Sequence, residues 1–175
     1  MKPVALIGAA SGWGAGFRHT EEGPAALRKL GLERWLAAGG VGAEWRAMIE
    51  SEKHWRAHPE VKPPETFDLV LRHAAQVADA VAAARGEGAF PVVIGGDHAV
   101  GMGSWAGVAR SLAYRPFGLI LLDAHLDAHT IETTPSMNAH GMGMAALLGQ
   151  GYPPFLALCG GLLRPEHVCY VGIRS

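Results

Sequence analysis

Residues 117–127 of this chain read Phe-Gly-Leu-Ile-Leu-Leu-Asp-Ala-His-Leu-Asp, an apolar run that ends in alternating acidic and imidazole side chains. The run predicts a buried strand over 117–123. Alternate residues of a strand point the same way, so Asp123, His125 and Asp127 are expected to converge on one small volume. Burying two carboxylates there is costly without an opposing charge. The stretch therefore predicts a divalent-cation site; the alternative is an exposed strand end with three solvated polar residues.

A second polar cluster follows another short apolar run. Gly95-Gly96-Asp97-His98 comes directly after residues 90–94, which also read as a strand. A lone histidine here would more often be structural or capping. Carboxyl ends of parallel strands share one edge of a sheet, however, so His98 is expected beside the three residues above. Oxygen and imidazole ligands without thiolate favour a borderline-hard metal such as manganese.

Apolar strands alternate with helical patterns along the chain. We expect strands at 4–8, 43–49, 90–94, 117–123 and 167–173, and helices at 24–38, 66–86, 99–113 and 141–148. Strands that are apolar throughout indicate a parallel sheet that helices cover on both faces. The predicted fold class is α/β, a three-layer αβα domain with a mainly parallel sheet.

The composition limits the classes of binding partner that the chain is expected to have. The 175 residues are 49% hydrophobic, and 15 basic against 16 acidic residues give a net charge of -1. This balance favours neither nucleic acid nor an anionic membrane, so a small molecule is the expected partner. No apolar stretch approaches the roughly 20 residues that span a bilayer. Residues 1–10 faintly resemble a signal peptide, but a first core strand is favoured because a βα unit follows, and the expected location is cytoplasmic.

Two further patterns leave alternatives open. Cys159 and Cys169 lie among apolar residues without Cys-x-x-Cys spacing, which favours buried thiols of a reduced compartment, although a disulfide remains possible. The glycines at 8, 12, 14 and 16 could suggest a dinucleotide-binding loop. Their spacing is not Gly-x-Gly-x-x-Gly, and no helix starts at the last one, so this interpretation is disfavoured.

Residues 133–141, Thr-Thr-Pro-Ser-Met-Asn-Ala-His-Gly, form a polar loop after the candidate metal strand. One interpretation is a turn with ordinary capping residues. The other is a substrate-recognition loop, in which hydroxyl and amide groups bind a carboxylate and His140 exchanges a proton. The second interpretation is favoured because the loop follows the strand that carries the candidate metal ligands.

Three of these motifs resemble signatures of the arginase/ureohydrolase family, in the family's order: Gly-Gly-Asp-His at 95–98, Asp-Ala-His-x-Asp at 123–127 and Ser-x-Asn-x-His-Gly at 136–141. Residues 22–28 also resemble the family's N-terminal helix, and the 134–140 pattern is most like that of arginases. The resemblance implies a metallohydrolase acting on linear amidine C–N bonds. The expected reaction is manganese-dependent hydrolysis of the guanidinium group of L-arginine to ornithine and urea.

The resemblance also implies roles for individual residues. Two manganese ions would be held by His98 and Asp127 on one ion, His125 on the other, and Asp123 bridging both. Asp127 and His140 are the expected catalytic residues, with His140 transferring a proton.

Four loop residues are expected to bind the substrate. Thr134, Ser136 and Asn138 match positions that hydrogen-bond its amino-acid end, and His129 stands where arginases commonly carry an Asn that contacts the substrate carboxylate. Met137, Ala99 and Gly143 also differ from the Gly, Ser and Pro that are common at these positions in arginases, and these differences bear on the choice of substrate and not on the metal ligands.

A later acidic motif of the family, Ser-x-Asp-x-Asp-x-x-Asp-Pro, has no counterpart, since no Asp follows Asp127. Residues 1–175 are therefore expected to be the N-terminal part of a single arginase-like domain, incomplete at the C-terminus. We expect a weakly held second ion, impaired activity and uncovered apolar strands. The full-length protein is expected to be a homo-oligomer, a trimer or hexamer. Alternatives are another ureohydrolase (agmatinase, guanidinobutyrase or formiminoglutamase) or an inactive truncated metal-binding remnant.

Overall fold

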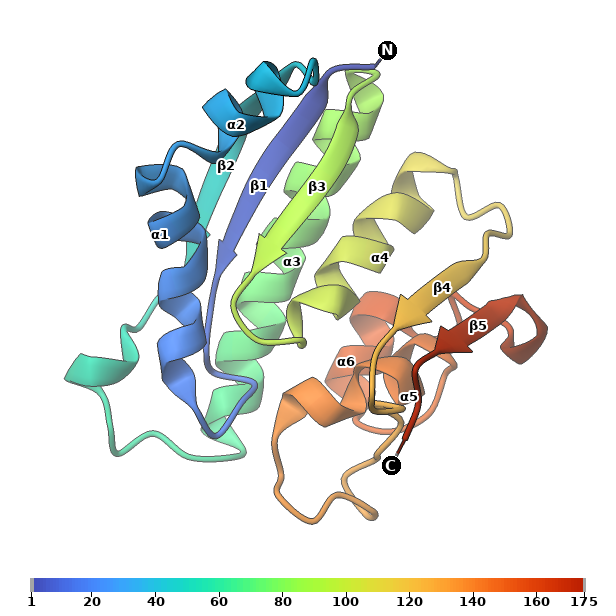
Figure 1. The fold of residues 1–175 in the computed structure, drawn as a ribbon. Helices are drawn as coiled ribbons and strands as arrows, with labels where there is room; N and C mark the ends of the chain where they lie inside the picture. Colours follow the sequence, from blue (N-terminus) through green and yellow to red (C-terminus); the bar gives the residue numbers. More distant parts are fainter. Residues whose placement is uncertain (1, 175) are drawn as a thin grey trace.

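A computed structural model describes residues 2–174 and confirms the α/β class (Figure 1). Two parallel sheets form its framework. The first has the strand order β2-β1-β3 and the second pairs β4 with β5. The strands are β1 (Val4–Ala10), β2 (Ala43–Glu50), β3 (Phe90–Gly95), β4 (Leu119–Leu122) and β5 (Val168–Val171). The α-helices are α1 (Gly23–Lys29), α2 (Leu32–Ala38), α3 (Glu65–Gly86), α4 (Val100–Ser111), α5 (Gly143–Leu147) and α6 (Pro153–Cys159).

Helices cover both faces of the first sheet. Helices α1 and α2 lie on one face and α3 on the other, so that β1 is buried along most of its length (Figure 1). In β1, Leu6 lies opposite Val92 of β3 and Trp45 of β2. This part of the molecule has the three-layer arrangement that the sequence predicts.

Helix α3 packs closely against α4, and two glycines of α4 make the contact possible. A Cβ at Gly103 would meet the backbone of Ala74, and a Cβ at Gly107 would meet the backbone of Ala78. Small residues on one helix thus bring it close to the other. Since α4 begins just after His98, this packing also anchors one side of the candidate site.

Two helix predictions need correction. The predicted helix 24–38 is two helices, because Gly31 between them has a left-handed φ of 77° that interrupts the hydrogen-bond ladder. Helix α6 was not predicted; Pro153 and Pro154 occupy its first turn, where no N–H is needed.

The second sheet differs from the prediction of a sheet covered on both faces. Leu119 and Leu121 of β4 face the core, but Ile120 and Leu122 are 67% and 78% exposed. Val171 of β5 is half exposed as well. The expectation of uncovered apolar strands is therefore confirmed for this sheet.

The two cysteines also differ from each other. Cys159 is buried, and burial raises the pKa of its thiol to about 12. Cys169 lies on β5 and is exposed, so the prediction of two buried thiols is wrong for this residue. Both cysteines are free thiols, without a disulfide between them.

No helix within residues 2–174 has both the length and the apolar character needed to cross a membrane.

Candidate metal centre

The exit of β3 holds His98 through a dense set of backbone contacts. The buried carboxylate of Asp97 accepts hydrogen bonds from the N–H groups of Gly14 (2.9 Å) and Ala99 (2.8 Å). The N–H of Asp97 donates to the carbonyl of Ser11 at 2.9 Å, and a Cβ on Gly96 would collide with the backbone of that serine. Burial raises the pKa of Asp97. His98 therefore follows a turn whose backbone has little freedom to move.

The exit of β4 is built differently from the predicted strand. The strand ends at Leu122, so residues 123–127 do not alternate as a strand would. Asp123 still donates its N–H to the carbonyl of Val171 at 3.1 Å, and its Oδ1 then accepts the N–H of His125 at 2.9 Å. Asp127 has a left-handed φ of 49°. Turns therefore bring the carboxylates of Asp123 and Asp127 together, and not the alternation of side chains along a strand, as the sequence had suggested.

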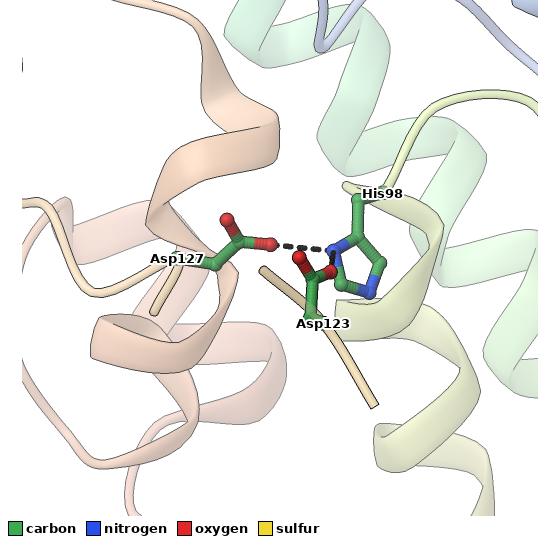
Figure 2. Close-up of side chains that lie close together, drawn as sticks. All are labelled: His98, Asp123 and Asp127. Atoms are coloured by element: carbon green, nitrogen blue, oxygen red, sulfur yellow. Dashed lines mark ion pairs between the residues drawn. The ribbon is translucent and has the colours of Figure 1, made fainter. Parts of the chain in front are cut away.

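Three side chains meet between these two exits (Figure 2). The Nδ1 of His98 lies 2.5 Å from Oδ2 of Asp127 and 3.3 Å from Oδ2 of Asp123. All three ligand atoms lie within 4.8 Å of one another. The interaction with Asp127 raises the pKa of His98, and the N–H of His125 lowers the pKa of Asp123. One imidazole and two carboxylates are thus directed at one point.

His125 lies beside this group and outside it. Its Nδ1 is 3.3 Å from Oδ1 of Asp123, whereas His98 contacts Oδ2, and the His125 side chain is 64% exposed. The structure therefore brings together His98, Asp123 and Asp127 and leaves His125 beside Asp123, outside the group.

The donor set fits one divalent cation. Two carboxylate oxygens and one imidazole nitrogen suit a borderline-hard metal, and three protein ligands leave coordination positions for water or a ligand. Around a second ion, the residues described here offer Oδ1 of Asp123 and the imidazole of His125. The fit is consequently good for one ion and poor for two.

A cleft of about 750 Å³ opens over this group. Its lining includes His98, Asp123, His125, Asp127, His129, Thr134, Ser136 and His140. These are all the predicted site residues except Asn138, which donates its N–H to Ser136 Oγ (3.3 Å) and whose side-chain amide faces Gly16. The loop predicted to recognise a substrate therefore forms a wall of the same cleft as the candidate ligands.

Similarity to known proteins identifies the family of the chain. The sequence profile of the arginase family matches residues 2–175. The chain belongs to the arginase family. It is 40% identical over 185 residues to arginase from Bacillus caldovelox, an alignment that covers 100% of this chain and 59% of that protein.

Solved arginase structures share the fold. The arginase of Bacillus subtilis superposes with a TM-score of 0.85 at 33% identity, covering 100% of this chain and 58% of that one. An Entamoeba histolytica arginase in complex with L-ornithine gives a TM-score of 0.86 at 29% identity, covering 100% and 59%. The chain thus has an arginase fold and spans a little under three fifths of the length of these arginases.

Within this arginase-family site, the loop residues also hold the loop itself together. Thr134 Oγ1 accepts the N–H of Met137 (3.1 Å), and His129 Nδ1 lies 3.3 Å from Thr133 Oγ1. His140 donates its N–H to the carbonyl of Gly14 at 2.9 Å. The capping interpretation of this loop is therefore correct for Thr134, and it is compatible with a place in the cleft wall.

Two residues with a structural part in the site were not predicted. Asp97 stood inside the Gly-Gly-Asp-His motif without a role, although it links Gly14, the partner of His140, to the turn that carries His98. Tyr170 donates its hydroxyl to the carbonyl of Leu126 at 2.9 Å. Burial and the nearby Asp127 raise the pKa of Tyr170. No local sequence signal marks a contact between residues 44 positions apart.

Proposed function

We propose that this site binds Mn²⁺ and that the protein hydrolyses the guanidinium C–N bond of L-arginine to ornithine and urea. The observation that carries the proposal is the group of His98, Asp123 and Asp127 at a cleft whose wall includes the loop 129–141, in a member of the arginase family. The names of the similar proteins support it, as does the L-ornithine complex of the Entamoeba histolytica arginase.

A bound divalent cation supplies Lewis acidity and makes a water molecule easier to deprotonate near neutral pH. The chain's own residues set the surroundings for that chemistry. Asp123 and Asp127 bring two negative charges to the cleft, which would offset the two positive charges of one such cation. Ion pairs with His98 hold both carboxylates at one place in the cleft.

Proton transfer and substrate orientation are assigned to the cleft walls. His140 lines the cleft and is fixed through its backbone to Gly14, so its imidazole can give a proton to the leaving amine or pass one to solvent. Thr134 and Ser136 offer hydroxyl groups for the amino-acid end of the substrate, and His129 offers an imidazole to its carboxylate.

The second ion of the family is expected to be weak in this chain. Two Mn²⁺ ions carry four positive charges, of which Asp123 and Asp127 offset two. We therefore propose that the chain binds one ion clearly more tightly than a second, and that turnover by these 175 residues alone is impaired.

Calorimetric titration with Mn²⁺ tests the metal assignment. Asp127→Asn is expected to abolish tight binding, because it removes a charged ligand next to His98. His125→Asn is the matched control, since this residue lies outside the three-residue group and its loss should spare the tighter ion. Equal loss in both variants, or no Mn²⁺ binding by the unmodified protein, would contradict the proposed centre.

A different substrate within the same reaction type is the second candidate. His129 lines the cleft and replaces an amide by an imidazole at a position assigned to the substrate carboxylate. Urea release from arginine and agmatine, guanidinobutyrate hydrolysis and formiminoglutamate hydrolysis should be compared under equal Mn²⁺. Preference for agmatine would replace the arginase assignment by an agmatinase one, and binding of Mn²⁺ without turnover of any of these substrates would favour the metal-binding remnant.

Homo-oligomerisation and a cytoplasmic location stay predictions.

A further inference from the structure

Asp127 has an uncommon backbone conformation. Its φ of 49° lies in the left-handed region, which is sterically strained for residues with a Cβ and which aspartate adopts only occasionally. Such a conformation persists only where surrounding contacts hold it. The contacts around this residue therefore decide where its carboxylate points.

Both peptide groups that flank Asp127 are held by distant parts of the chain. The carbonyl of Leu126, on one side, accepts the hydroxyl of Tyr170 at 2.9 Å. The carbonyl of Asp127 itself accepts the N–H of Met144 at 2.9 Å. The orientations of two successive peptide planes define φ and ψ of the Cα between them. Tyr170 and Met144 together thus define the backbone of Asp127.

Strand β5 supports the rest of this loop as well. The carbonyl of Val171, next to Tyr170, accepts the N–H of Asp123 at 3.1 Å. The N–H of Arg174 donates to the carbonyl of Ala124, also at 3.1 Å. These neighbouring contacts use backbone atoms only. Tyr170 is different because its contribution comes from a side-chain hydroxyl, which one substitution can remove.

We propose that Tyr170 is a positioning residue for the metal centre: its hydroxyl fixes the peptide between Leu126 and Asp127 so that the Asp127 carboxylate faces His98 before a cation binds. Without the hydroxyl, this peptide can rotate and Asp127 can relax to a negative φ, which turns its carboxylate away. A coordinating side chain that is already oriented loses less conformational freedom when a cation binds, so the affinity for the cation is higher. The inference rests on the proposed metal binding for its effect on affinity.

Tyr170→Phe removes the hydroxyl and keeps the ring. Calorimetric titration with MnCl₂ should give an affinity about five- to tenfold weaker than that of the unmodified chain, the effect of one hydrogen bond. Tyr152→Phe is the matched control, because Tyr152 packs against Phe67 and Phe155. Its affinity should be unchanged. Equal Mn²⁺ affinity in Tyr170→Phe and the unmodified chain overturns the proposal.

A metal-free measurement separates this inference from the proposed function. Backbone scalar couplings of Asp127, measured by NMR without any cation, report whether its φ is positive. We expect a positive φ in the unmodified chain and in Tyr152→Phe, and a shift towards negative φ in Tyr170→Phe. An unchanged φ in Tyr170→Phe overturns the positioning role. Failure of the unmodified chain to bind Mn²⁺ would instead count against the proposed function.

Discussion

Strands β1 and β4 are both apolar, yet they are buried to different degrees. Residues 5–9 of β1 are buried, with Ile7 at 0% exposure, because helices lie on both faces of its sheet. In β4 burial alternates, and Ile120 is 67% exposed. A run of apolar residues therefore indicates a strand without saying how many of its faces are covered.

The two sides of the candidate metal centre differ in the same way. His98 follows the sheet that is covered on both faces, and its turn is fixed by the buried Asp97. Asp123 and Asp127 follow the half-covered sheet, and contacts from β5 and α5 hold their loop. Variants on the two sides should differ in size of effect accordingly.

The largest effect is expected in the covered sheet. Ile7→Ala removes a fully buried side chain and should lower the free energy of unfolding by about 2–5 kcal/mol. Ile120→Ala in β4 should change it by less than about 0.5 kcal/mol, because that side chain is mostly solvated already. Urea denaturation of both variants measures the difference, and equal losses would refute the contrast between the sheets.

Asp97→Asn should have the next largest effect. The substitution places an amide NH₂ against one of two backbone N–H donors, which leaves a buried polar group unpaired and costs about 1–3 kcal/mol. Asp79→Asn is the control, because Asp79 is exposed and its ion pair with Arg110 contributes about 0–1 kcal/mol. Thermal denaturation that gave both variants the same melting temperature would mean that the β3 exit is less tightly held than its contacts indicate.

A smaller, pH-dependent effect should come from His73 on α3. This side chain is buried against β2, where its Nε2 donates to the carbonyl of Ile49 at 3.1 Å, and burial lowers its pKa. Below the ordinary histidine pKa near 6.5, the unfolded chain binds a proton that the folded chain resists. Stability should therefore fall as pH drops from neutral, by at most about 1.4 kcal/mol per pH unit from this group.

His73→Gln keeps a hydrogen-bond donor and removes the titration. Urea denaturation at several pH values between 7 and 5 should show a shallower loss of stability in this variant than in the unmodified chain. Parallel curves would exclude His73 as a source of the acid sensitivity.

The smallest change in stability is expected for Leu122→Lys on the uncovered face of β4. With 78% of Leu122 exposed, the free energy of unfolding should move by less than about 0.5 kcal/mol. Self-association and binding of an apolar dye should decrease, because the exposed apolar surface shrinks. Light scattering of the two proteins at matched concentrations checks this, and an unchanged value would mean that the face is not a source of association.

Much of the fold could be predicted because its signals are local. The apolar run of β1 and the three-and-four spacing in α3 are properties of short segments, and both elements form close to their predicted bounds. Gly31 was not recognised as a break, since one glycine in a helical pattern is often tolerated. The exposed face of β4 could not be predicted, because it depends on what other segments cover.

The site was predicted in part, and for a partly wrong reason. His98 lies near Asp123 and Asp127 as predicted, but the strands before them, β3 and β4, belong to two separate sheets and share no sheet edge. Strand alternation was the wrong geometry for the two acids, since the turn at Asp127 depends on Tyr170 and Met144, which are distant in sequence. His125 was expected to share the same face; it lies outside the group, and β4 ends before it, at Leu122.

The position of the candidate ligands gives a bound cation a mechanical part in the molecule. His98 follows β3 of one sheet, whereas Asp123 follows β4 of the other. A cation coordinated by both would act as a reversible cross-link that closes the chain between them, much as a disulfide closes a loop. Loading and removing the ion would then change how cooperatively the two sheets unfold, in addition to any effect on chemistry at the cleft.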